Sequence, residues 1–222
     1  MVSRFISGVL VASILLFSTI TFAADSELSF ALSAEKVKPI EVGTEVPDAV
    51  IRSVGGATVK FREEISNKPT VLIFYRGGWC PFCNTQLGEI STIEEELRSL
   101  GFQVIAVSPD RPQKLQENRT KQNLKYHLYS DSKMELASAF GLAFKVDAAI
   151  VLMYKEKYGI DLEADSGESH HLLPVPAAFV IDAGGIIRYR YYNADYKVRV
   201  SSKELLEEAR GIQNNRGSLW KR

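Results

Sequence analysis

The sequence predicts an α/β protein built around one mixed β-sheet. Short runs rich in β-branched and aromatic residues alternate along the chain with segments whose apolar residues recur at helical spacing. One run, residues 70–75, is apolar almost throughout, which is typical of a strand buried on both faces. The last two runs are joined by the turn Ala183-Gly184-Gly185, and so short a turn connects only antiparallel strands.

The first predicted elements lie on either side of this central strand. Two short alternating runs flank Gly55-Gly56 within residues 49–61 and predict an N-terminal β-hairpin. After the central strand, apolar residues repeat every three or four positions over residues 87–100, and Gly101 ends the run. This pattern predicts a long helix with a glycine just beyond its C-terminal end.

The remaining elements continue the alternation. We expect one helix capped by Asp131 or Ser132 and a last helix capped by Ser201. We interpret residues 142–173 as an insertion with a short helix over 151–157 and a polar loop over 163–171. The other predicted elements are strands at 103–107, 127–130, 177–181 and 186–191, and helices at 111–123, 131–140 and 203–210.

Length and composition indicate one well-cored domain, which we assign to residues 41–222. The chain has 222 residues, of which 45% are hydrophobic and 24% are charged. Lys and Arg together number 27, as do Asp and Glu, so the formal net charge is zero. This balance removes the electrostatic reason to expect nucleic acid or an anionic membrane as a partner.

The N-terminal residues have the features of an export signal. Arg4 supplies a positive start, an apolar stretch follows over residues 9–17, and Thr21-Phe22-Ala23 places small residues where a signal peptidase cleaves. We expect a signal peptide over residues 1–23, a linker over 24–40 and export of the protein to a periplasm. The alternative is an uncleaved segment that anchors the protein in the membrane.

The two cysteines of the chain form the motif Cys80-Pro81-Phe82-Cys83. Because the motif follows a predicted strand and opens a predicted helix, both sulfurs are expected on one side of the first helical turn. The unpaired N–H groups and the helix dipole at that end favour a thiolate, which predicts a lowered pKa for Cys80. We expect Cys80 to be the nucleophile nearer the solvent and Cys83 to resolve its product, with Pro81 at the first helical position.

The motif has two other interpretations, a metal site and simple packing. A zinc site needs two more ligands, for which His170-His171 is the candidate pair, and adjacent histidines rarely bind one metal together. Packing of both cysteines in a core conflicts with Pro81 and with the strand-to-helix context. Gly77-Gly78 lacks the spacing of a dinucleotide-binding motif, and we expect no cofactor.

Several segments resemble one known family. Tyr75-Arg76-Gly77-Gly78-Trp79-Cys80-Pro81-Phe82-Cys83 resembles the active-site loop of peroxiredoxin-like proteins in the alkyl hydroperoxide reductase/thiol-specific antioxidant (AhpC/TSA) family. Further similar segments lie at residues 42–48, 131–141 and 175–182, so the resemblance extends over most of the predicted domain.

The resemblance implies a thioredoxin-like fold, a three-layer sandwich with a mixed central sheet, an N-terminal β-hairpin and an insertion before the strand that follows a cis-proline. That proline would be Pro176, facing the dithiol, and Val175 would offer its backbone to an extended substrate. Trp79 would shield the dithiol from one side. Arg76 either supplies positive charge near the thiolate or lies solvated at the strand end.

One position departs from the family pattern. Peroxidatic sites of peroxiredoxins place Thr or Ser three residues before the reactive cysteine, whereas this chain has Gly77 there relative to Cys80. The hydrogen bonds that activate a peroxide are therefore not transferable to this chain by motif. The dithiol itself looks like that of thioredoxin-type reductases.

We therefore expect a thiol oxidoreductase in which Cys80 attacks a peroxide or a disulfide and Cys83 closes an internal disulfide. An external thiol or dithiol donor would supply the electrons. One competing hypothesis is a non-catalytic binding module that keeps the fold. Another is a protein that delivers metal through Cys80, Cys83 and the histidines.

Overall fold

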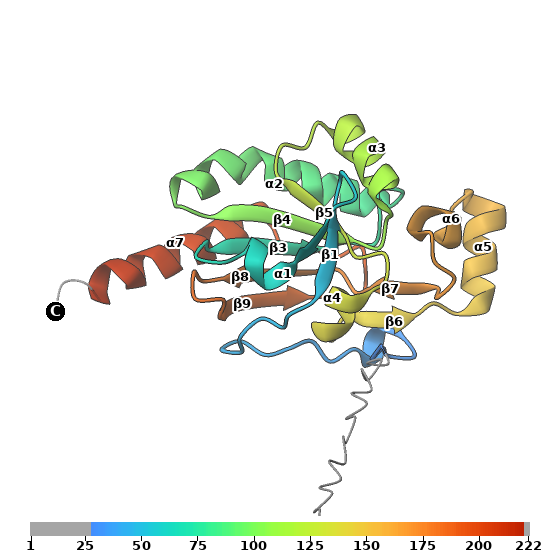
Figure 1. Ribbon diagram of the computed structural model, residues 1–222, viewed down its shortest axis with the longest axis horizontal. Coiled ribbons are helices and arrows are strands. Elements are labelled where there is room, and N and C mark those ends of the chain that lie inside the picture. Colours follow the sequence, from blue (N-terminus) through green and yellow to red (C-terminus); the bar gives the residue numbers. More distant parts are fainter. Residues whose placement is uncertain (1–27, 220–222) are drawn as a thin grey trace, which may run out of the picture.

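A seven-stranded mixed sheet forms the centre of the computed structural model, which describes residues 28–219 (Figure 1). The strand order is β2-β1-β5-β4-β3-β8-β9. The strands are β1 (Val50–Ser53), β2 (Thr58–Lys60), β3 (Thr70–Phe74), β4 (Gln103–Ser108), β5 (His127–Ser130), β8 (Ala177–Ile181) and β9 (Ile187–Tyr192). The helices are α1 (Phe61–Glu64), α2 (Pro81–Ser99), α3 (Pro112–Gln122), α4 (Glu135–Ala139), α5 (Ala148–Tyr158), α6 (Leu162–Ser166) and α7 (Ser202–Leu219).

The pairing of the strands confirms the predicted mixed sheet. β3, β4 and β5 run parallel to one another, and β8 pairs antiparallel with β3, then β9 with β8. The hairpin of β1 and β2 joins the sheet through an antiparallel pairing of β1 with β5. All five residues of β3 are buried, as expected for the central strand.

Helices cover both faces of the sheet and make a three-layer sandwich. Side chains alternate along β3, so that Val71 and Ile73 pack in the core beneath α2, α3 and α7, while Leu72 and Phe74 pack in the core beneath α1 and α4. Figure 1 shows α2 and α3 on one side of the sheet. The predicted three-layer architecture is therefore confirmed.

The predicted cap at Ser201 is confirmed for a helix that is longer than expected, whereas the helix predicted from Asp131 begins only at Glu135, with Met134 as its N-cap residue. The Ser201 hydroxyl accepts a hydrogen bond from the Glu204 N–H, but α7 continues to Leu219. The Asp131 carboxylate accepts hydrogen bonds from the N–H groups of Leu136 and Ala137 in α4. These carboxylate contacts satisfy donors that the start of a helix otherwise leaves unpaired.

The insertion contains more structure than the sequence pattern indicates. Its predicted short helix is present as α5, but the region expected to be a polar loop contains α6. The Asp161 carboxylate accepts a hydrogen bond from the Ala164 N–H and caps α6, a signal within a polar stretch that the prediction overlooked. The antiparallel strands β6 (Ala143–Lys145) and β7 (Leu172–Pro174) close the insertion at its base.

The segment predicted as a linker is, over residues 28–40, part of the folded domain. The Ala31 N–H donates to the Ala143 carbonyl, and the Ile40 N–H donates to the Phe140 carbonyl. Val37 and Ile40 pack against the core beneath α4. Apolar residues spaced among polar ones anchor this segment, which corrects the linker prediction.

The predicted signal peptide, residues 1–23, lies outside the described residues. Within residues 28–219, none of the helices has both the length and the apolar character that crossing a membrane requires.

Candidate active site

The dithiol lies where β3 passes into α2. Cys80 is the N-cap residue of α2, with extended backbone at φ −86° and ψ 113°, and Pro81 occupies the start of the helix. Cys83 follows within the first turn, and both cysteines are free thiols. The predicted placement of both cysteines at the start of a helix is therefore confirmed.

The pKa values of the two cysteines are shifted in opposite directions. The pKa of Cys80 is lowered to about 6, mainly because the Cys83 thiol hydrogen-bonds to the Cys80 sulfur, against a raising effect of burial. The charges of Arg76 and Arg199 lower it further by smaller amounts. Burial raises the pKa of Cys83 well above its ordinary value. At neutral pH the turn therefore holds one thiolate and one thiol.

Cys80 was expected to lie nearer the solvent than Cys83, and both side chains are buried. Its exposed fraction is 1%, and that of Cys83 is 0%. Both side chains belong to the core beneath α2, which Trp79 also contacts. The N-cap position brings Cys80 close to the helix end, but its side chain is buried in this core. Only a small reactant, or a larger one after local opening, can reach the sulfur.

Arg199 contacts the deeper cysteine directly. Its guanidinium donates hydrogen bonds to the Cys83 sulfur at 3.3 Å and to the Gln86 side-chain oxygen at 2.9 Å. A third hydrogen bond, from Nε to the Tyr196 carbonyl at 2.7 Å, fixes the side chain. This cation stabilises negative charge on either sulfur, and it lowers the pKa of both.

Arg76 is buried rather than solvated. Its exposed fraction is 5%, and its guanidinium lies 4.1 Å from the ring centre of Tyr196, 5.0 Å from that of Trp79 and 5.6 Å from that of Tyr154. It donates a hydrogen bond to the Tyr154 hydroxyl. Within residues 28–219 no carboxylate lies within ion-pair distance of Arg76. Its charge therefore favours a nearby anion, which the Cys80 thiolate provides.

The loop before the dithiol requires two glycines. Gly77 has φ +148°, and a Cβ atom there would collide with the Trp79 indole. A Cβ atom on Gly78 would lie 2.9 Å from Cγ of Asn118. The Gly78 N–H donates to the Asp110 carboxylate at 2.7 Å, and the Gly78 carbonyl accepts from the Asn84 amide at 2.8 Å. The loop is thereby held by groups on both sides.

The prediction of a cis-proline is wrong, because residues 28–219 contain no cis peptide bond. Pro176 follows β7 and precedes β8 in the trans form, which is the intrinsically favoured isomer for an X–Pro bond. The Val175 N–H is not free for an extended substrate, since it donates to the Leu142 carbonyl at 2.9 Å. Val175 and Pro176 instead line a groove of about 390 Å³ together with Arg76, Tyr154 and Tyr196.

The two histidines of the insertion make contacts within the protein. His170 Nε2 lies 2.7 Å from the Ser132 carbonyl oxygen, and His171 Nε2 lies 2.8 Å from a Glu163 carboxylate oxygen. In the described part of the chain, no three His, Cys, Asp or Glu side chains are grouped as metal ligands.

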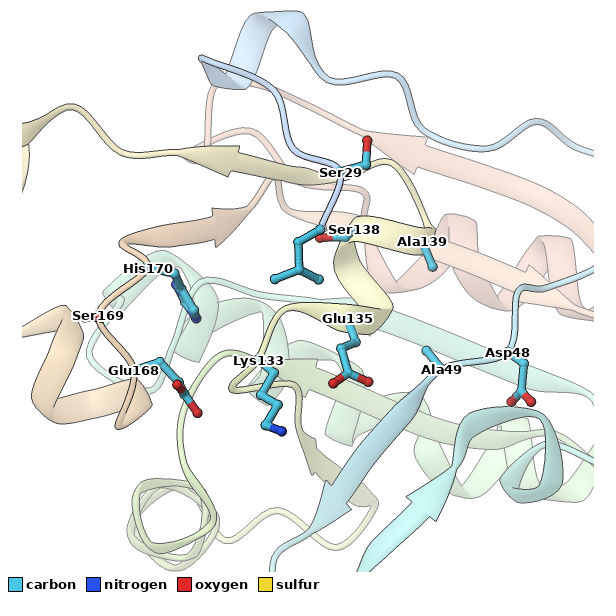
Figure 2. A pocket seen from close by; sticks show the side chains of 11 residues that line it. Ser29, Asp48, Ala49, Lys133, Glu135, Ser138, Ala139, Glu168, Ser169 and His170 are labelled. Atoms are coloured by element: carbon cyan, nitrogen blue, oxygen red, sulfur yellow. The ribbon is translucent and has the colours of Figure 1, made fainter. Parts of the chain in front are cut away.

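A separate hollow of about 720 Å³ lies between β1, α4 and the segment before β7. Figure 2 shows Lys133, Glu135, Glu168 and His170 around it. None of the residues 76–83 lines it. It is therefore distinct from the dithiol site.

Sequence reasoning missed Arg199, Tyr154, Tyr196 and Asp110. Arg199 is 116 positions from Cys83, and no local pattern links the two residues. Asp110 carried a usable signal, because it follows β4, the parallel neighbour of β3, and the carboxyl ends of parallel neighbours meet at one sheet edge.

Comparisons with known proteins agree with this architecture. The model of the AhpC/TSA family matches residues 42–190. Peroxiredoxin Bcp of Bacillus subtilis is 34% identical over 101 residues, which cover 46% of this chain and 64% of the relative. The putative peroxiredoxin bcp of Haemophilus influenzae is 29% identical over 106 residues, covering 48% of this chain and 68% of the relative.

Two solved structures show the same fold. Peroxidoxin BcpB from Mycobacterium tuberculosis superposes with a TM-score of 0.61 at 18% identity, over 78% of this chain and 98% of that chain. Reduced Prx3 from Vibrio vulnificus, in complex with H2O2, superposes with a TM-score of 0.62 at 18% identity, over 77% of this chain and 99% of that chain. The match to the family model extends over more than half of the sequence. The chain is a member of the AhpC/TSA family, with a peroxiredoxin-like thioredoxin fold.

Proposed function

We propose that the protein is a thiol peroxidase in which Cys80 reduces a hydroperoxide and Cys83 resolves the product. The observation that carries this proposal is the pairing of a Cys80 sulfur with a pKa lowered to about 6 and a neighbouring Cys83 that stays protonated. The relatives named peroxiredoxins support a peroxide as the substrate.

The first step is an attack of the Cys80 thiolate on one oxygen of the hydroperoxide. The sulfur–oxygen bond forms as the oxygen–oxygen bond breaks, giving a Cys80 sulfenic acid and an alcohol, or water from hydrogen peroxide, after proton uptake by the leaving oxygen. Arg76 and Arg199 stabilise the attacking thiolate. The low pKa keeps Cys80 ionised at neutral pH.

The second step closes the disulfide. The Cys83 sulfur attacks the Cys80 sulfenic acid, so that a sulfur–sulfur bond forms and water leaves with the proton of the Cys83 thiol. Because burial disfavours the Cys83 thiolate, the hydrogen bond from Arg199 to its sulfur is the contact that assists this step. An external thiol or dithiol then reduces the disulfide and restores both thiols.

The burial of Cys80 favours a peroxide over a protein disulfide as the oxidant. A sulfur with an exposed fraction of 1% is within reach of a molecule of two or a few heavy atoms, whereas a protein disulfide needs the loop to open. The groove lined by Arg76, Val175 and Tyr196 offers space for the organic part of a larger hydroperoxide.

Stopped-flow mixing of the reduced protein with hydrogen peroxide and with cumene hydroperoxide tests the proposal. We expect a fast Trp79 fluorescence change in the wild type and in C83S, and none in C80S. A wild-type rate no higher than that of a free thiol contradicts the peroxidase proposal. If the protein then reacts rapidly with oxidised dithiothreitol, thiol–disulfide exchange is the function instead.

We also propose that the protein acts after export, on the basis of the signal-like sequence of residues 1–23. An exported dithiol needs a dedicated thiol donor to stay reduced. Cell fractionation of the full chain is expected to recover a shortened protein outside the cytoplasm. Recovery of the full-length chain from the cytoplasm contradicts this proposal.

A further inference from the structure

Asp110 is a buried carboxylate at the carboxyl end of β4, with an exposed fraction of 2%. One of its oxygens, Oδ2, accepts a hydrogen bond from the Gly78 N–H at 2.7 Å and another from the Ser108 hydroxyl at 3.1 Å. Gly78 lies two positions before the reactive cysteine. The carboxylate of Asp110, which lies outside the dithiol motif, therefore holds the loop before Cys80 through a hydrogen bond.

The hydrogen bond between Asp110 and Gly78 affects the position of Cys80 through a short series of further hydrogen bonds. The Cys80 N–H donates to the Gly77 carbonyl at 3.1 Å, and the Gly78 carbonyl accepts from Asn84 in α2. A peptide held at its N–H by Asp110 and at its carbonyl by Asn84 fixes the direction of the turn. Because charged acceptors make stronger hydrogen bonds than neutral ones, the hydrogen bond from the Gly78 N–H is strongest when Asp110 is ionised.

Asp110 is surrounded by groups that bear on its ionisation. Burial raises the pKa of Asp110 to about 7, and the hydrogen bond from the Gly78 N–H opposes that effect. Asp165 on α6 acts in the raising direction and Lys114 on α3 in the lowering direction. Tyr75 at the end of β3 also acts on it, and the further titratable groups that line hollows with Asp110 are Glu117 and Lys121 on α3 and His170 and His171 before β7.

We propose that Asp110 is a positioning residue for the Cys80 reaction, whose carboxylate holds the Gly77–Gly78 turn in the reactive conformation when ionised and holds it more weakly when protonated. This inference rests on the proposed function for its rate readout. Cys80 thus carries the chemistry, and Asp110 decides how well the loop presents it near neutral pH.

The test compares the pH profiles of Cys80 reactivity in D110N, D110A and D131N. The wild-type rate with hydrogen peroxide is expected to rise over a broad pH range in two overlapping steps, the lower from ionisation of Cys80 near pH 6 and the upper from ionisation of Asp110 near pH 7. D110N keeps an acceptor for the Gly78 N–H but cannot ionise, so the upper step disappears. D110A loses the acceptor, and its rate at pH 8 should fall roughly tenfold.

D131N is the matched control. Asp131 is also buried, with its pKa raised to about 7, but its carboxylate holds α4 rather than the dithiol loop. D131N should keep both steps in the profile even if it alters stability. Thermal unfolding of each variant shows whether the variants fold.

Alkylation of Cys80 by iodoacetamide over the same pH range separates the two proposals. If the wild type fails to reduce peroxide, the peroxidase proposal falls, yet the alkylation profile still reports on Asp110. An upper step that survives in D110N, or an unchanged rate at pH 8 in D110A, overturns the positioning role. Loss of the upper step in D131N as well also overturns it, because the effect would then not be specific to the loop.

Discussion

The two faces of the central sheet pack against cores of different composition. Beneath α1 and α4 lies a core with a cluster of aromatic rings. The ring centre of Phe140 lies 5.0 Å from the ring centres of both Phe74 and Phe179. Beneath α2, α3 and α7 lies a second core that includes both cysteines. The strands are shared, since alternate residues of β3 enter each core.

This difference indicates that stability and reactivity are separable in this molecule. The aromatic face contributes mainly apolar burial, with Tyr129 as the ionisable side chain of its core, whereas the dithiol face combines burial with an ionised sulfur and two arginines. Substitutions on the first face should change the free energy of unfolding, and those on the second should change the chemistry of Cys80.

The largest expected effect on stability comes from Phe140→Ala on the aromatic face. Phe140 has an exposed fraction of 0%, and its loss leaves a cavity among three other phenylalanines. We expect the free energy of unfolding to fall by about 3–5 kcal/mol in urea titrations. The peroxide rate per folded molecule should stay unchanged, and a large fall in that rate would break the separation of the two faces.

One buried aspartate near each face is expected to make the free energy of unfolding depend on pH. Asp110 beside the dithiol loop and Asp131 at α4 both have a pKa raised by burial to about 7. Between about pH 4 and pH 7 the folded chain keeps these protons while the unfolded chain has released them, so stability falls as pH rises and levels off above 7. Each group should contribute on the order of a few kcal/mol across this window.

Urea titrations from pH 4 to pH 8 measure this slope. D110N and D131N should each flatten it, because an amide has no proton to retain. A slope identical to that of the wild type in both variants would show that neither aspartate holds its proton in the folded state.

Removing the Cys83 thiol sharpens the account of the dithiol face. The hydrogen bond from this thiol is the largest contribution to the lowered pKa of Cys80. Cys83→Ala should therefore raise that pKa, whereas Cys83→Ser, which keeps a donor, should raise it less. Thiolate absorbance at 240 nm against pH measures both variants. Equal midpoints in C83A and wild type would contradict the assigned cause.

Arg199→Gln should slow the closing of the disulfide. The change removes a charged donor from the Cys83 sulfur while leaving an uncharged amide. We expect the second fluorescence phase after peroxide mixing to slow roughly tenfold. R199K, which restores charge without the planar fork, should recover part of the rate. An unaltered phase in R199Q would remove Arg199 from the resolving step.

The smallest expected effect belongs to the contact between the insertion and the site. Tyr154→Phe removes the hydroxyl that accepts from Arg76 but keeps the ring. Stability should fall by about 1 kcal/mol, with the peroxide rate within about threefold of the wild type. A loss of activity as large as that of C80S would assign Tyr154 a direct part in the reaction.

Local patterns predicted most of the fold. The strands at 177–181 and 127–130 have the predicted bounds, and the first of them is a compact apolar run that ends at the turn Asp182-Ala183-Gly184. The insertion was predicted less well, since the helix over Leu162–Ser166 lies in a polar stretch where only the Asp161 cap marks its start. The isomer of Pro176 came from resemblance rather than from any local pattern, and it is trans.

The candidate site was predictable only in its linear part. The strand-to-helix context identifies Cys80, Pro81 and Cys83 in the sequence. The direction of the Cys80 pKa shift also follows from that context. The burial of Cys80 and the contacts of Arg199 and Tyr154 depend on how distant segments pack. No periodicity or motif in one sequence encodes those distances.

The most direct test is the rate of iodoacetamide alkylation against pH, with the modified residue identified by mass spectrometry. We predict that Cys80 alone is modified at neutral pH, with the lower step of its profile near pH 6. A midpoint near that of an unperturbed thiol, or modification of Cys83 first, would contradict the assignment of Cys80 as the ionised nucleophile.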